Sequence, residues 1–257
     1  MARNLLLTGG PGPDHDFAAI AADLDDLLAE PGPDLGTGFT TTAVTEPTAA
    51  IELLAAADEG AIEPWDLLSV HALRWDMAQD RYADQRAEHA RALRPGDGDA
   101  LAAFVAAGGG LLALHTAVIC FDADPAWRRL VGASWAWGRS GHAPAGPVPI
   151  AVTETGRAHE ITRDLDAFTV TDEVYGDLDL EPAPDRDVPV GAAAPLLTGV
   201  HEGRAQPVLW TRTAGRGRVV TDLLGHGPAS LAHPVHRTII RRAASWAART
   251  TTEPKGP

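Results

Sequence analysis

The chain has 257 residues, of which 45% are hydrophobic and 22% are charged, a composition typical of a globular protein with a full apolar core. Acidic residues outnumber basic ones 35 to 21, and the resulting formal charge of −14 argues against nucleic acid or an anionic membrane as a partner. A single cysteine, Cys120, excludes an intrachain disulfide and a cysteine-based zinc site.

Short apolar runs alternate with helical periodicity in the first half of the chain. The predicted strands are Asn4–Thr8, Thr37–Val44, Trp65–Val70 and Leu111–Leu114. Helices are expected from Phe17, from Pro47, near Asp84–Leu93 and over Asp97–Ala107. This alternation predicts an α/β fold with a doubly wound, mainly parallel sheet and helices on both faces.

After Gly146 the pattern changes to short strands without long helices between them. These strands are expected to extend the same sheet, and they are Val148–Thr153, Val188–Ala193, Pro207–Arg212 and Gly217–Asp222. A final helix is predicted over Pro234–Ala248, with His233 and His236 near its start as capping or surface residues. Three arginines around Gly215 indicate a hairpin turn with a structural role.

The chain shows no targeting or membrane signal. Its first apolar run, Leu5–Leu7, is too short for a signal peptide, and no stretch approaches the roughly 18 apolar residues of a membrane span. A cytoplasmic location is therefore the simplest expectation.

Several histidines follow predicted strands, where ligands bind in open α/β sheets. His15, His71 and His115 come soon after strands of the first half, and His226 follows a later one. Since the carboxyl ends of parallel strands meet at one edge of a sheet, these side chains are expected to converge there.

A set of short motifs, in this order, resembles the ThuA-like family, named for trehalose utilisation. They are Thr8-Gly9-Gly10 with His15, Gly108-Gly109-Gly110 with His115, Gly141-His142, Asp172-Glu173-Val174-Tyr175, Pro207-Val208-Leu209-Trp210, Gly215-Arg216-Gly217-Arg218-Val219 and Leu224-Gly225-His226. The resemblance covers nearly the whole chain. The family usually has His-Pro where this chain has His159-Glu160 and Gln206-Pro207.

The resemblance implies a flavodoxin-like, class I glutamine amidotransferase-like fold with extra C-terminal strands. It also implies a single domain over residues 1–250, followed by a polar tail at 251–257. The family is tied to sugar catabolism, in some members to 3-keto disaccharides. A sugar or keto-sugar derivative is accordingly the expected ligand, and a homo-oligomer is left open.

His115 stands where amidotransferases of this fold carry their nucleophilic cysteine, so glutamine amidotransferase activity is not expected. The only thiol, Cys120, lies five residues further on and is interpreted as a small packed residue, because nothing in the sequence gives it a base or an electropositive setting.

The candidate catalytic residues are His115, Asp172, Glu173 and His226. Adjacent strand residues point to opposite faces, so one of the two carboxylates is expected to enter the site and act beside a histidine. The candidate substrate-binding residues are His15, His142, Tyr175 and Trp210, whose indole face suits sugar C–H groups.

A divalent metal is an open alternative to direct proton transfer. His15, His115, His142, His226 and Asp172 are all acceptable ligands for zinc or a similar ion. Two further alternatives stay open, a sugar-binding or sensor module without catalysis and an amidohydrolase-type enzyme.

Overall fold

The computed structural model describes residues 1–11, 15–181 and 195–250. The strands and α-helices of its first half are β1 (Ala2–Gly9), α1 (Phe17–Ala29), β2 (Phe39–Val44), α2 (Pro47–Asp58), β3 (Leu67–Ala72), α3 (Ala83–His89), α4 (Asp97–Ala106), β4 (Gly110–Leu114) and α5 (Pro125–Val131). Those that follow are β5 (Ala133–Ser134), β6 (Gly146–Val152), α6 (Glu154–Ala158), β7 (Phe168–Asp172), β8 (Asp179–Leu180), β9 (Leu197–His201), β10 (Arg204–Ala214), β11 (Gly217–Asp222), α7 (Pro228–Leu231) and α8 (Pro234–Ala248).

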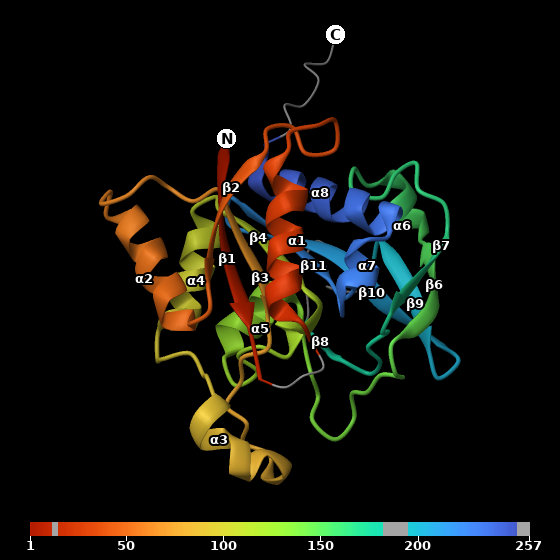
Figure 1. The fold of residues 1–257 in the computed structure, drawn as a ribbon, viewed down its shortest axis with the longest axis horizontal. Helices are drawn as coiled ribbons and strands as arrows, with labels where there is room; N and C mark the ends of the chain where they lie inside the picture. Colours follow the sequence, from red (N-terminus) through yellow and green to blue (C-terminus); the bar gives the residue numbers. More distant parts are fainter. Residues whose placement is uncertain (12–14, 182–194, 251–257) are drawn as a thin grey trace.

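A nine-stranded sheet runs through the molecule in the order β2-β1-β3-β4-β11-β10-β9-β6-β7 (Figure 1). The five strands from β2 to β11 are mutually parallel, while β10, β9, β6 and β7 each pair antiparallel with their neighbours. The last strand of the chain, β11, therefore lies in the middle of the sheet. This arrangement confirms the predicted doubly wound, mainly parallel α/β fold with an extension from the second half of the chain.

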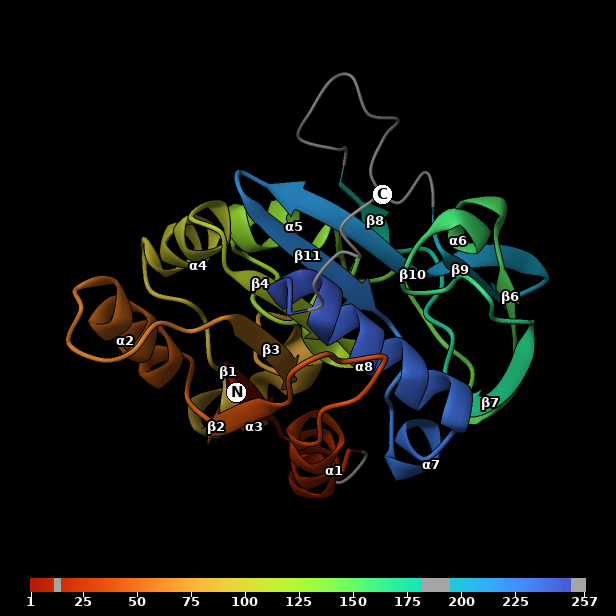
Figure 2. The same ribbon diagram turned by 90° about the horizontal axis from the view of Figure 1, so that it is seen from above.

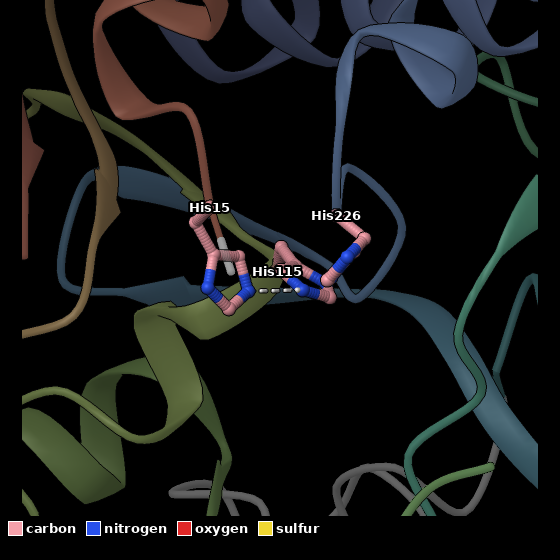
Figure 3. Close-up of side chains that lie close together, drawn as sticks. All are labelled: His15, His115 and His226. Carbon is pink, nitrogen blue, oxygen red and sulfur yellow. Dashed lines mark hydrogen bonds between the residues drawn. The ribbon is translucent and has the colours of Figure 1, made fainter. Parts of the chain in front are cut away.

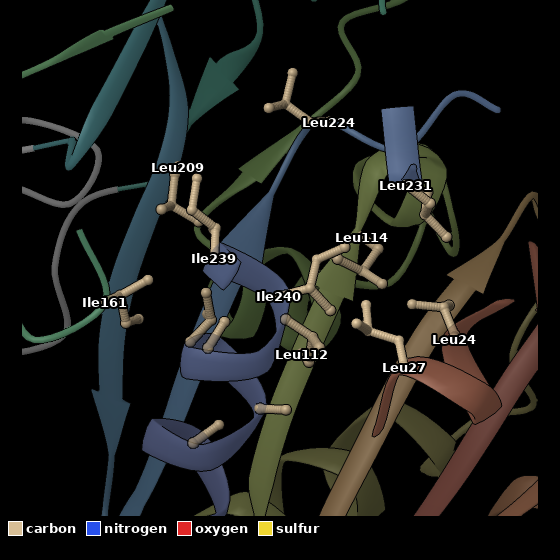
Figure 4. Close-up of a cluster of buried hydrophobic side chains, with 14 of the residues drawn as sticks. Leu24, Leu27, Leu112, Leu114, Ile161, Leu209, Leu224, Leu231, Ile239 and Ile240 are labelled. Carbon is tan, nitrogen blue, oxygen red and sulfur yellow. The ribbon is translucent and has the colours of Figure 1, made fainter. Parts of the chain in front are cut away.

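Strand alternation sends apolar side chains to both faces of the sheet. On β4, Leu112 and Leu114 pack in one cluster with α1 and α8, whereas Leu111 and Ala113 pack in another with α2, α4 and α5. Figure 2 shows α7 and α8 on one side of the sheet and α4 and α5 on the other. Figure 4 shows the first cluster, in which Ile239 and Ile240 of α8 face the strands.

Local sequence signals explain the helix ends. The Asp16 side chain accepts a hydrogen bond from Ala19 N and caps α1. Pro47 and Pro234 occupy the first turns of α2 and α8, where a missing N–H has no cost. The final helix begins and ends at the predicted residues.

The structure also differs from the sequence expectations. Strand β3 lies two residues further along than predicted, so His71 is inside the strand rather than after it. Strands β7 and β9 were not anticipated as separate elements, since each has only 5 residues and no turn motif on both sides. The strand predicted at Val188–Ala193 and the tail at 251–257 lie outside the described residues.

The carboxyl ends of the five parallel strands and of β7 point to the same edge of the sheet. The loop before β6 reaches this edge as well, because β6 runs in the opposite direction. Helix α3 projects from the body of the molecule at this end (Figure 1). Among the described residues, no helix is long and apolar enough to cross a membrane.

Truncating a central side chain tests the packing of this core. Leu112→Ala should lower the free energy of unfolding by roughly 2–5 kcal/mol, because a fully buried leucine leaves a cavity. Leu180→Ala is the matched control, and since Leu180 is 47% exposed its effect should stay within about 0.5 kcal/mol. Urea unfolding followed by circular dichroism measures both, and equal effects would contradict the assigned core.

Candidate functional site

Three histidines from distant parts of the chain meet at the carboxyl edge of the sheet. His15 lies in the loop after β1, His115 directly follows β4, and His226 lies in the loop after β11. Their side chains point toward one another (Figure 3). The ring centroids of His15 and His115 are 5.3 Å apart, and that of His226 lies 4.7 Å from His15 and 5.4 Å from His115.

His115 occupies a sharp turn between β4 and the 3-10 turn His115–Val118. Its φ of 47° is left-handed, which is costly for a residue with a side chain and is found where a structure holds a functional group in place. His115 thus stands at a sharp turn after a strand. The resemblance to amidotransferases led us to expect such a turn at this residue.

The hydrogen bonds of His115 fix its tautomer. Its Nδ1 lies 2.9 Å from the Leu223 carbonyl oxygen, which can only accept, so Nδ1 carries the proton. Burial and the neighbouring histidines His15, His71 and His226 hold the pKa of His115 well below its usual range, and they outweigh the bond to Leu223, which raises it. The neutral ring therefore keeps a lone pair on Nε2.

Two groups face that Nε2 atom. The Tyr175 hydroxyl donates to it at 2.9 Å, and His15 Nε2 lies 3.3 Å away. Burial raises the pKa of Tyr175 well above its ordinary value, so the phenol keeps its proton. Tyr175, which lies in the segment after β7, thus donates its hydroxyl hydrogen to the histidine cluster.

Glu173 is the carboxylate that faces the histidines. Its oxygens lie 3.1 Å from His142 Nδ1, 3.4 Å from His226 Nδ1 and 3.8 Å from His115 Nε2. The hydrogen bond to Glu173 raises the pKa of His142. Glu173 is only 6% exposed, whereas His142 is 39% and His226 22% exposed, so the two imidazoles lie between the carboxylate and solvent.

Asp172 points away from this group and is fully buried. Its Oδ1 accepts from the backbone N–H groups of Glu173 and His226, and its Oδ2 accepts from Gly225 N. The sequence expectation that one carboxylate of the pair enters the site is met by Glu173. Asp172, one of the predicted catalytic residues, holds the backbone of Glu173 and His226 through these bonds.

Gly225 adopts a φ of +116°, which a residue with a side chain rarely adopts. Its carbonyl accepts a hydrogen bond from His71 Nε2 at 2.9 Å. Burial lowers the pKa of His71 to about 4, so this ring is neutral. His71 is thus a buried residue that hydrogen-bonds to the loop carrying His226 and helps to fix that loop.

A second buried network is connected to Asp172 through Ser230, whose side chain hydrogen-bonds to the Asp172 carboxylate. Ser230 Oγ lies 2.9 Å from His236 Nδ1, and His236 Nε2 lies 3.3 Å from Asp222 Oδ2. Burial alone would lower the pKa of His236, but the charge of Asp222, the hydrogen bond to it and the charge of Asp172 outweigh burial and raise the pKa. His236, predicted as a capping or surface residue, is wholly buried, and sequence spacing held no signal for this network.

Two further sequence expectations concern Trp210 and Cys120. Trp210 was expected to bind substrate, but it is 1% exposed and its indole N–H donates to the Val131 carbonyl, so it lies in the core beneath the site. Cys120 is buried as expected, its Sγ donates to the Ala72 carbonyl, and burial raises its pKa to about 12. Neither side chain offers a face or a thiolate to a ligand.

A family model described as trehalose utilisation, ThuA, matches residues 84–247. The chain belongs to the ThuA family. The matched segment contains His115, His142, Glu173 and His226, and the segment before it contributes His15. No curated protein matches the sequence.

Solved structures agree with the ThuA fold. A ThuA-like protein from Parabacteroides merdae is 16% identical with a TM-score of 0.70, over 100% of this chain and 93% of that one. A ThuA-like protein from Bacteroides uniformis is 17% identical with a TM-score of 0.65, over 96% and 91%. A β-galactosidase from Rahnella is 14% identical with a TM-score of 0.58, over 98% of this chain but 32% of that one. At these identities the likeness concerns the fold.

Replacing His236 tests the buried network. Because the pKa of His236 is raised in the folded state, its stabilisation is complete below about pH 6.5 and is lost as pH rises through the folded pKa. His236→Gln should therefore cost on the order of 3 kcal/mol at pH 6 and less at pH 9. Urea unfolding at both pH values measures this, with the exposed His89→Gln as control. A cost that does not change with pH would contradict a charged His236.

The absence of an elbow cysteine predicts that the protein releases no ammonia from glutamine. Cys120 cannot substitute, because its thiol stays protonated near neutral pH and is buried. An enzyme-coupled ammonia assay on the wild type and on Cys120→Ser checks this. Ammonia release by the wild type that disappears in the variant would show the expectation to be wrong.

Proposed function

We propose that this ThuA-family protein is an enzyme of carbohydrate catabolism that acts on a sugar or keto-sugar derivative by acid–base chemistry. The observation that carries the proposal is the pairing of buried Glu173 with half-exposed His142 beside the Tyr175–His115 pair. A hydroxyl-bearing ligand that reached this edge of the sheet would meet both a proton acceptor and an oxygen-binding group.

His142 is the proposed proton-transfer group and Glu173 its positioning residue. The carboxylate holds the Nδ1 side of the ring at 3.1 Å, so Nε2 is the nitrogen left to take a proton from the substrate. Because Glu173 raises the pKa of His142, the ring is a stronger base than an isolated imidazole.

Tyr175 and His115 are the proposed oxygen-binding groups. A proton next to a carbonyl becomes removable when the electron pair can move onto the carbonyl oxygen and a donor stabilises it there. The Tyr175 hydroxyl is such a donor, since its raised pKa keeps it protonated. In the structure this hydroxyl lies 2.9 Å from His115 Nε2, to which it donates. A keto-sugar carbonyl oxygen could take the place of His115 Nε2 as the acceptor of that hydrogen bond.

Family membership supports the sugar assignment, because the family model is described as trehalose utilisation. A cytoplasmic location belongs to the same proposal, and it fits the lack of a membrane-spanning helix in the described residues.

Turnover of disaccharides and of their 3-keto derivatives tests this function. His142→Ala should lower kcat/KM by about 10²–10⁴-fold, the usual loss for a general base. In the wild type, kcat/KM should rise with pH around a midpoint above the ordinary 6.5 of histidine, because deprotonated His142 is the active form. Glu173→Gln should move this midpoint to lower pH as well as lowering the rate.

His89→Ala is the matched control, since His89 lies on α3 away from the cluster and should leave both the rate and the pH profile unchanged. A midpoint that does not move in Glu173→Gln would contradict the proposed pairing. Sugar binding without turnover would instead favour a binding or sensor module, and ammonia release from amide substrates would favour an amidohydrolase.

A further inference from the structure

We propose that His15, His115 and His226 form a binding site for one divalent transition-metal ion of the zinc class. Each of the three side chains offers a nitrogen, and these three nitrogens all lie within 4.8 Å of one another. The inference concerns the same edge of the sheet as the proposed reaction, but it does not depend on the sugar assignment.

The spacing of the first two nitrogens suits such an ion. Zinc binds imidazole nitrogen at about 2.0–2.1 Å with tetrahedral angles, so two ligating nitrogens are expected about 3.3 Å apart. His15 Nε2 and His115 Nε2 are 3.3 Å apart. Two ring nitrogens held at this separation can share an ion without moving toward or away from each other.

His115 is oriented as metal-binding histidines usually are. Such histidines donate the ring N–H that does not bind the metal to a carbonyl or carboxylate, which fixes the tautomer and directs the other nitrogen. His115 Nδ1 donates to the Leu223 carbonyl at 2.9 Å, and its Nε2 lone pair faces both His15 and the Tyr175 hydroxyl, whose hydrogen bond to His115 an ion would replace.

His226 adds an independent observation. Its Nδ1 atom is buried and makes no hydrogen bond within the described part of the chain, although Glu173 Oε2 lies 3.4 Å away at an unfavourable angle. Buried polar atoms in native proteins nearly always have a partner. An ion bound by His226 through this nitrogen would provide one.

The donor set also selects the class of ion. Three imidazoles suit Zn²⁺, Co²⁺ or Ni²⁺ better than Mg²⁺ or Ca²⁺, which prefer oxygen. The Glu173 carboxylate, 3.4 Å and 3.8 Å from two of the rings, supplies negative charge beside the ion. Three protein ligands leave a fourth position open, as in catalytic rather than structural zinc sites.

Metal binding to untagged, chelator-treated protein tests the proposal directly. Titration with ZnCl₂ by calorimetry, and with CoCl₂ by visible absorption, should give one ion per chain. His15→Ala and His226→Ala should each weaken zinc binding by at least about 100-fold, since even losses around a metal's outer shell cost 10–100-fold. His89→Ala, an exposed histidine outside the cluster, should bind like the wild type.

No zinc binding by the folded wild type would overturn the proposal, as would binding that both cluster variants retain. Circular dichroism melts establish that each variant is folded, and the loop positions of His15 and His226 make them safer targets than buried His115. Binding without keto-sugar turnover would leave the metal site intact and contradict the proposed reaction. Turnover unaffected by full metal removal would show that the proposed reaction does not use the ion, while zinc binding itself would still be decided by the titrations.

Discussion

The carboxylate of Asp172 is the constraint on which the site depends. It stands at the end of β7, the last strand of the antiparallel half, and accepts backbone N–H groups from the loop that follows β11 in the parallel half. Burial raises the pKa of Asp172, while hydrogen bonds from Ser230, Gly225 and Glu173 oppose this rise by favouring the charged form. One side chain thereby joins the end of β7 to the loop after β11, although these two strands do not pair with each other.

This join sets the distance between Glu173 and His226. Glu173 is turned toward the histidines because its own N–H is held by Asp172, and His226 is held by the same carboxylate. The positions of the proton-transfer pair and of the three-histidine cluster are thus coupled. The two adjacent acidic residues therefore have different partners, since Asp172 accepts hydrogen bonds from the backbone and Glu173 faces the imidazoles.

The sequence predicted the fold well and the site in part. Periodicity and turn residues located the parallel strands and the final helix, because these features are local. His15, His115 and His226 were nominated because they follow predicted strands, whose carboxyl ends share one edge, whereas His142, Glu173 and Tyr175 were nominated from motifs that resemble the ThuA-like family. The separation of Asp172 from Glu173, the burial of Trp210 and the network of His236 depend on contacts between residues far apart in the chain, for which spacing gives no signal.

The central place of β11 has a consequence for synthesis on the ribosome. Strand β11 lies between β4 and β10, so before residues 217–222 leave the ribosome the sheet exists as two separate pieces with unpaired edges. Such edges are templates for pairing with other chains, which makes the nascent protein vulnerable to aggregation until β11 is available. The same strand leads to His226, and so the functional edge cannot assemble before the two pieces are joined.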